Sequence, residues 1–253
     1  MSAITVILDP EQRQAHVRRL LELEGLGDVE EDTHTAYCPI SLTNTPDDLK
    51  AYLRTRQAVL ADRVLAPAGI HAYDPGSAPF SPDRNLTTRP DEVYTTDSGK
   101  IASARYFTGH HLVPSTGLGI ELEKAKTLGR VSVILADRAI RVSRMQPHRT
   151  IYLEYTNFTD QADEFIPVFR LLQEFEPGIG LNGPTPALLG FERGSSRIVD
   201  LEELVYQEFP QLQYHWKGTV PILKVRAENP DLFYEHREPA ADDRATASRN
   251  APR

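Results

Sequence analysis

The chain has 253 residues, of which 40% are hydrophobic and 25% charged, a composition typical of a globular protein with one large domain or one domain and an appendage. Its formal net charge of −8 argues against a broad surface for nucleic acid or anionic membrane, although a helix N-terminus can still bind a small anion. The single cysteine, Cys38, excludes an intrachain disulfide and a multi-cysteine zinc site.

The sequence also lacks the usual signals for a metal site or a membrane segment. None of the eight histidines lies in an HExxH motif, and adjacent His110 and His111 would point to opposite faces of a strand. No apolar run approaches the ~20 residues that a membrane span needs, and no basic region precedes the short apolar run at the N-terminus. We therefore expect a cytoplasmic protein without a metal, a membrane partner or a nucleic-acid partner.

Residues 1–32 are predicted to form a helical leader. Asp9 can cap a helix that has Pro10 in its first position and Gln12 three residues after the cap. A short apolar face follows, and Gly25 is a suitable stop. We expect this helix to cover an edge of the main domain.

From residue 33 the pattern alternates between strands and helices. The predicted strands are residues 35–40, 70–75, 105–113, 131–137 and 151–158. The predicted helices run from Thr45 toward Gly69, from Asp97 to Ala104, from the turn at 117–119 to about Leu128, and over 160–175. This alternation predicts a doubly wound α/β fold of the Rossmann or flavodoxin type, with a parallel sheet of about five strands flanked by helices, in residues 33–175. Ligands of such folds bind at the carboxyl ends of the strands.

Residues 176–238 are predicted to form a C-terminal extension. GIGLNG at 178–183 fits a GxGxxG motif by its letters, but it follows a predicted helix and precedes two prolines, so we expect a loop. A helix is predicted over 201–209 and an edge strand over 219–225. The polar residues 239–253 are expected to be a disordered tail.

The most informative segment is PSTGLGIELEKA, residues 114–125. Gly117 and Gly119 are predicted to form a tight turn between a strand and a helix, where a ligand can approach the backbone closely and the helix N-terminus favours an anion. The third glycine of a dinucleotide site is missing. Glu121 is placed in the first helical turn, and Ser115 adds a hydroxyl group.

A carboxylate beside such a space suits the cleavage of a glycosidic or N-glycosidic bond. That reaction builds positive charge at the anomeric carbon, which a carboxylate such as Glu121 can stabilise or attack while a second acid protonates the leaving group. Asp97 is the candidate second acid. Each residue also has a purely structural interpretation, Glu121 as a favourable first-turn charge and Asp97 as a helix N-cap.

These residues resemble the nucleoside 2-deoxyribosyltransferase family, and most closely its 2'-deoxynucleoside 5'-phosphate N-hydrolase branch. STGLGIELEKA at 115–125 is similar to the family's (D/S)xGxGxELGxA element around its catalytic glutamate, and TAYCPIS at 35–41 resembles its first strand. The resemblance implies that Glu121 is the nucleophile, that Tyr37 orients it by a hydrogen bond, and that Asp97 protonates or binds the nucleobase.

Six residues are predicted to bind the substrate. They are Ser115, Thr116, Gly117, Gly119, Ser41 and Asp74. Hydrolase members carry a glycine- and arginine-containing phosphate loop after the first strand, whereas this chain reads PISLTNT at 39–45, with hydroxyl donors such as Thr43 but no arginine. The long segment 74–92 is either a substrate lid or a surface loop.

The expected function is therefore cleavage of the N-glycosidic bond of a nucleoside or nucleoside 5'-monophosphate, as hydrolysis with water or as transfer with a second base. No metal or organic cofactor is required. Two alternatives remain open: cleavage of the nicotinamide bond of NAD, and a nucleotide-binding or sensor module without chemistry. Because members of the resembling family are usually homo-oligomers with shared active sites, the resemblance also implies self-association.

Overall fold

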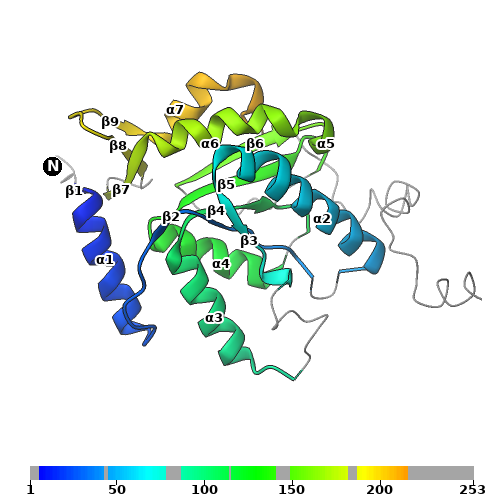
Figure 1. Cartoon of the computed structure of the whole chain (residues 1–253), viewed down its shortest axis with the longest axis horizontal. Helices are drawn as coiled ribbons and strands as arrows, with labels where there is room; N and C mark the ends of the chain where they lie inside the picture. The colour runs from blue at the N-terminus through cyan, green and yellow to red at the C-terminus, as the bar shows by residue number, and fades with distance from the viewer. Residues whose placement is uncertain are drawn as a thin grey trace, which may run out of the picture.

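The computed structural model of the chain describes residues 6–42, 45–77, 87–113, 115–140, 149–181 and 187–215, which contain two sheets (Figure 1). The larger sheet has the order β3-β2-β4-β5-β6, and all of its strand pairs are parallel. Its strands are β2 (Asp32–Tyr37), β3 (His71–Tyr73), β4 (Ala104–His110), β5 (Val131–Asp137) and β6 (Thr150–Tyr155). The predicted α/β fold with a five-stranded parallel sheet is confirmed. The strand order reverses between β2 and β4, and the crevice at such a switch point is where doubly wound folds bind ligands.

Helices cover both faces of the larger sheet, and each face has its own hydrophobic core cluster. Figure 1 shows α3 (Pro90–Ser103) and α4 (Thr116–Thr127) below the sheet and α2 (Asp47–Val59) and α6 (Ile166–Gln173) above it. The remaining helices are α1 (Pro10–Leu23), which packs with the α3 and α4 cluster, and α5 (Phe158–Gln161) and α7 (Leu201–Glu208), which pack with the α2 and α6 cluster. The helix predicted over 201–209 is confirmed by α7.

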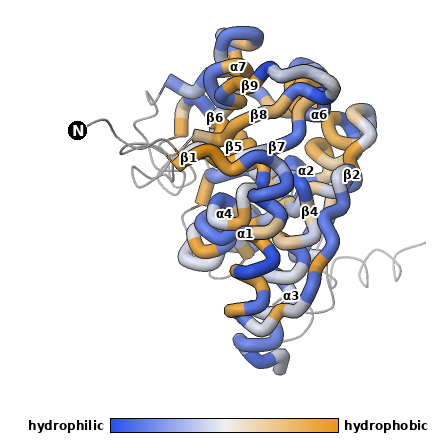
Figure 2. Tube along the Cα trace, turned by 90° about the vertical axis from the view of Figure 1, so that its left-hand side faces the viewer, coloured by the Kyte–Doolittle hydropathy of each residue, from blue (hydrophilic) through white to orange (hydrophobic). Residues whose placement is uncertain are grey.

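The smaller sheet is antiparallel and has the order β1-β7-β8-β9. Its strands are β1 (Val6–Leu8), β7 (Phe175–Leu181), β8 (Ala187–Glu192) and β9 (Ile198–Asp200). Residues of β1 and β8 are hydrophobic along most of their length (Figure 2). Since β1 belongs to the predicted leader and β7 to the predicted C-terminal extension, these two segments of the chain form one sheet.

The helix predicted for the leader begins where its capping residues indicate. The Gln12 backbone N–H donates to Asp9 Oδ1 at 2.8 Å, and the Asp9 N–H donates back to Gln12 Oε1 at 3.2 Å. This reciprocal capping box, with Pro10 in the first turn, confirms the predicted start of α1.

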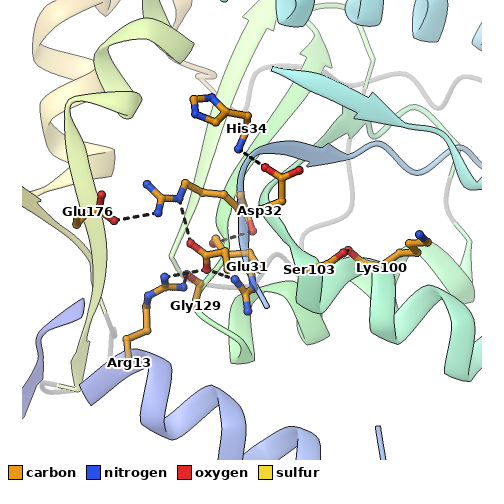
Figure 3. A network of polar contacts seen from close by, with 11 residues as sticks. Arg13, Glu31, Asp32, His34, Lys100, Ser103, Gly129 and Glu176 are labelled. Atoms are coloured by element: carbon orange, nitrogen blue, oxygen red, sulfur yellow. Dashed lines mark hydrogen bonds and ion pairs between the residues drawn. The ribbon is translucent and has the colours of Figure 1, made fainter. Parts of the chain in front are cut away.

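A buried charge network joins the leader to both sheets (Figure 3). Glu31 accepts hydrogen bonds from Arg13 at 2.8 Å, from Arg105 at 3.0 Å and from Arg130, and Arg105 also donates to Glu176 of β7 at 2.9 Å. Burial alone would raise the pKa of Glu31, but the charges of its three arginines together lower it below its ordinary value. Glu31 therefore stays ionised at the amino ends of the strands and holds α1, β4 and β7 together.

The segment at 178–183 was predicted to be a loop, and this prediction is wrong for its described residues, because they lie in β7. Gly178 pairs with Leu189 of β8. A Cβ atom on Gly178 would lie 2.3 Å from Phe191 Cε2 and 2.7 Å from the Leu8 carbonyl oxygen. The glycine thus marks a close approach of neighbouring strands rather than a turn, a use of glycine that a strand interior allows.

Two helix starts also differ from the predictions. The helix predicted to begin at Asp97 begins at Pro90, so Asp97 lies inside α3 and is not an N-cap. Gly117 and Gly119 lie inside α4 rather than in a turn before it, because Ser115 caps the helix and Thr116 is its first residue. The predicted helix over 160–175 is present as α5, a 3-10 turn and α6, and Pro167 lies in the first turn of α6. The strand predicted at 219–225 and the tail at 239–253 lie outside the described residues.

Candidate active site

Tyr37 is the last residue of β2 and is fully buried at the switch point of the larger sheet. Because side chains alternate along a strand, its neighbours Ala36 and Cys38 join the core on the α2 side, whereas the Tyr37 ring packs on the α3 and α4 side. The ring stacks between two other aromatic rings, with centroids 5.7 Å from Tyr73 and 5.8 Å from Phe107. This packing fixes the position of the Tyr37 hydroxyl group.

The Tyr37 hydroxyl donates a hydrogen bond to Glu121 Oε1 at 3.1 Å, across 84 positions of the sequence. Glu121 is half-buried, and it is the sixth residue of α4 rather than a first-turn residue as predicted. Since the helix dipole acts mainly within the first turn, a favourable dipole does not account for a carboxylate at this position. The expected contact between Tyr37 and Glu121 is present.

Asp97 of α3 lies close enough to this pair to change its titration. Burial and the charge of Asp97 raise the pKa of Glu121 to about 7, against the lowering effect of the Tyr37 hydrogen bond. Burial likewise raises the pKa of Asp97, with Tyr37 again acting in the opposite direction. The pKa of Tyr37 is raised far above its ordinary value by burial and by both carboxylates. The three residues therefore form one coupled group, in which Tyr37 stays protonated and the pKa values of both carboxyls are raised above their ordinary values.

The N-terminus of α4 has fewer free N–H groups than the sequence suggests. The Leu118 N–H donates to Ser115 Oγ at 3.1 Å, and the Gly119 N–H donates to the Ser115 carbonyl at 3.2 Å. Within residues 117–119, only the Gly117 N–H is outside these bonds. Nothing lies within 4 Å of where a Cβ would stand on Gly117 or Gly119, so the space beside both glycines is open.

Thr116 and Gly119 line a pocket of about 430 Å³ on the outer side of α4, between α1, α3 and α4. Glu121 does not line this pocket. The structure thus places these two predicted substrate-binding residues at a different surface from the Tyr37–Glu121 pair, while Ser115 and Gly117 stay at the helix start.

Ser41 and Asp74 both have local structural contacts. The buried Ser41 hydroxyl donates to the Val113 carbonyl at 3.0 Å, which ties the loop after β2 to the loop after β4. Asp74 Oδ1 accepts the Gly76 N–H at 2.8 Å and so caps the short turn Pro75–Ser77. Both residues lie at the carboxyl ends of strands, as predicted, and Thr43 lies outside the described residues.

Tyr73, the last residue of β3, was not predicted as a site residue. It is directly paired with Tyr37 in the sheet register and stacks on it, and it is half-buried. Its pKa is raised by burial, by Asp97 and by Asp74, and Lys100 Nζ lies 5.2 Å from its ring centroid. An aromatic residue at the end of a predicted strand beside TAYCPI was the available signal. Tyr73 adds a second aromatic side chain to the site, beside Tyr37 and near Asp97.

No protein-family model matches the chain, and no curated protein is significantly similar to it. Among the described residues, no group of three or more His, Cys, Asp or Glu side chains is arranged to hold a metal ion. Across the same residues, no helix has the length and apolar character needed to cross a membrane.

Proposed function

We propose that this protein cleaves the N-glycosidic bond of a nucleoside or nucleoside 5'-monophosphate, with Glu121 acting on the anomeric carbon. The observation that carries the proposal is the 3.1 Å hydrogen bond from Tyr37 to a half-buried Glu121 whose pKa is raised to about 7 by burial and by Asp97. A structural carboxylate at a helix surface needs neither a buried tyrosine nor a second carboxyl beside it. Carboxyl groups with strongly perturbed pKa values are characteristic of functional sites.

The arrangement divides the reaction between the two carboxyls. The Tyr37 hydroxyl holds Glu121 Oε1, so Oε2 is the oxygen available to attack the anomeric carbon. As the bond from this carbon to the base nitrogen breaks, the nitrogen keeps the electron pair and takes a proton from the carboxyl group of Asp97, the acid assigned to this step. Water then releases the sugar from Glu121, or a second base accepts it; the outcomes are hydrolysis and transfer respectively.

Other features of the site support a nucleoside as the substrate. Tyr73 is half-buried and its pKa responds to the charge of Asp97, so the exposed part of its ring can contact a planar base near that acid. Ser115 and the Gly117 N–H lie at the N-terminus of α4, which suits the 5' end of a sugar. The resemblance of residues 115–125 to the deoxyribosyltransferase element agrees with this assignment, and self-association remains a prediction from the same resemblance.

Release of free base from a panel of deoxynucleosides and their 5'-monophosphates, measured by chromatography, tests the proposal. We expect Glu121→Ala to lower the rate by roughly 10²- to 10⁴-fold, the range for loss of a positioned catalytic group. Glu123→Gln changes an exposed glutamate of the same helix and is the matched control, for which we expect no more than a twofold change.

Each alternative function has its own outcome in this experiment. Equal rates for Glu121→Ala and the wild type contradict the mechanism. Release of nicotinamide from NAD without turnover of any deoxynucleotide selects the NAD-cleaving alternative. Saturable nucleotide binding without product, at high protein concentration and long incubation, selects the binding module.

A further inference from the structure

A second polar cluster surrounds Arg56 in the last turn of α2, outside the group formed by Tyr37, Glu121 and Asp97. The Arg56 guanidinium carbon lies 4.3 Å from the Tyr52 ring centroid and 5.1 Å from that of Tyr155. His110, Asp137 and Tyr155, which interact with Arg56, are the last residues of β4, β5 and β6. Arg56 therefore lies at the carboxyl ends of three adjacent strands, the edge at which doubly wound folds bind ligands.

The guanidinium of Arg56 is held in place but incompletely hydrogen-bonded. Its Nε and Nη1 atoms are buried and have no hydrogen-bond partner. Within the described parts of the chain, no ion pair involves Arg56. The two tyrosine rings attract its charge, but they leave these N–H groups without an oxygen acceptor. A buried unpaired donor costs free energy, more so in a charged group, so an acceptor from outside the described chain explains this arrangement best.

The groups around Arg56 leave its positive charge only partly compensated. Among the described residues, Asp137 has a carboxyl group near Arg56. Burial raises the pKa of Asp137. The hydrogen bond from the Ala139 N–H to Asp137 Oδ1, at 2.9 Å, and the charge of Arg56 both lower this pKa. Burial and the charge of Arg56 lower the pKa of His110 well below its ordinary value, so this histidine is neutral. Burial raises the pKa of Tyr52, while the charge of Arg56 and a hydrogen bond with it lower it.

We propose that Arg56 is the centre of a phosphate-binding site at the carboxyl ends of β4, β5 and β6. A guanidinium presents five N–H donors in a fixed fork that matches the oxygens of a phosphate group, and burial strengthens such charge-assisted bonds. The loop at 39–45, which follows β2, has no arginine, and Arg56 supplies a cation from the helix that comes after this loop. Because β4 lies between β2 and β5, the Arg56 site is on the same edge of the sheet as Tyr37.

The phosphate group bound at Arg56 can belong to inorganic phosphate or to a nucleoside 5'-monophosphate. Binding of the second at this position rests on the proposed function, whereas binding of the first does not. Calorimetric titration with inorganic phosphate, a deoxynucleoside and its 5'-monophosphate separates them. We expect the wild type to bind phosphate and the monophosphate, and to bind the monophosphate more tightly than the deoxynucleoside.

Arg56→Gln is the decisive variant, and we expect it to weaken phosphate binding by roughly 10- to 100-fold, as for loss of a charged hydrogen-bond donor. Arg18→Gln removes the same charge from an exposed position of α1 and is the matched control, with binding unchanged. Arg56→Lys keeps the charge without the fork; we expect an intermediate loss, and this variant provides the test if the glutamine variant does not fold. The proposal is overturned if the wild type does not bind phosphate. It is also overturned if Arg56→Gln and Arg56→Lys bind phosphate as tightly as the wild type does.

Asp137→Asn separates this proposal from a simple internal partnership of Arg56 with Asp137. Removing the carboxylate charge takes away repulsion of an anion, so we expect Asp137→Asn to bind phosphate several-fold more tightly. If Asp137 is instead the true partner of Arg56, the variant will leave phosphate binding unchanged, and its effect on folding stability will not add to that of Arg56→Gln; that result overturns the proposal. Phosphate binding that depends on Arg56 without release of base would leave this site intact and refute only the proposed function.

Discussion

Replacing Tyr37 with phenylalanine removes one oxygen atom from the candidate active site and leaves its packing in place. The Tyr37 ring is buried and stacked on Tyr73 and Phe107, contacts that a phenylalanine ring preserves. What is lost is the 3.1 Å hydrogen bond to Glu121 Oε1, which lowers the pKa of Glu121. Loss of this bond therefore raises the pKa of Glu121 above its value of about 7.

The size of the effect follows from the energy of the bond. A hydrogen bond to a charged group contributes about 1.5–3 kcal/mol, and 1.36 kcal/mol corresponds to one pH unit, so the pKa of Glu121 rises by about one to two pH units. With a pKa near 7, about half of the Glu121 side chains are ionised at pH 7, and in Tyr37→Phe this falls to about a tenth or less. If the carboxylate is the attacking group, base release at pH 7 falls by roughly 5- to 50-fold and recovers as the pH is raised.

Two measurements check this prediction. The first is the pH profile of kcat/KM for base release, whose acid limb moves to higher pH in Tyr37→Phe. The second is an NMR titration of the ¹³C-labelled glutamate carboxyl carbons, which reports the pKa of Glu121 without any assumption about activity. Tyr73→Phe removes a neighbouring hydroxyl and is the control, with its acid limb unmoved. An acid limb that stays in place in Tyr37→Phe, or moves to lower pH, means that the hydrogen bond from Tyr37 does not lower the pKa of Glu121.

Three further predictions concern stability, each measured by urea unfolding. Because the folded-state pKa of Glu121 is about 7, above the ordinary value of 4.5, its protonation stabilises the fold below pH 4.5, and this contribution is lost as the pH rises to 7. Glu121→Gln should therefore be more stable than the wild type at pH 8 by on the order of 3 kcal/mol, and equal pH dependence in both proteins contradicts this. Glu31→Gln leaves three buried arginines without their carboxylate and should cost about 3–5 kcal/mol, whereas Asp163→Asn, which breaks an exposed pair with Arg63, should cost less than about 1 kcal/mol. Ser115→Ala removes the N-cap of α4 and should cost about 1 kcal/mol, which Ser115→Asp should restore; equal stability of all three proteins argues against the cap.

The central part of the parallel sheet was predictable because β4, β5 and β6 are buried along almost their whole length. Such strands appear in the sequence as short apolar runs between turn residues, and VSVILAD, residues 131–137, coincides with β5. The first predicted strand was placed three residues late, since β2 begins with the polar residues Asp32, Thr33 and His34 before it enters the core.

The antiparallel sheet was not predictable from local pattern. β1 and β9 have three residues each, and β7 contains the proline and two glycines of FEPGIGL, which favour a loop when considered alone. These strands form because distant segments pair with them, as β1 does with β7. The start of α3 did carry a local signal, Pro90 followed by Asp91 and Glu92, which is typical of a first helical turn.

The candidate site depends on contacts that no local spacing encodes. Tyr37 and Glu121 are 84 positions apart, and only the resemblance to a family element predicted that they meet. Arg56 had no motif around it, because its unusual property, buried N–H groups without acceptors, exists only once α2 has packed at the ends of β4, β5 and β6.

Glu31 and Glu121 are both partly buried, and their surroundings act on them in opposite ways. Glu31, at the amino ends of the strands, is surrounded by three arginines that hold its pKa below the ordinary value despite burial. Glu121, at the carboxyl ends, has burial and Asp97 acting together, and only the Tyr37 hydroxyl acts against them. An ionised carboxylate fully paired with cations is suited to holding segments together and poorly suited to attack an electrophile. A carboxyl group with a raised pKa and no neighbouring cation is destabilised in its ionised form. A positive charge that develops beside it in a transition state stabilises that ionised form. That difference, rather than burial itself, is the physical reason to assign chemistry to Glu121 and structure to Glu31.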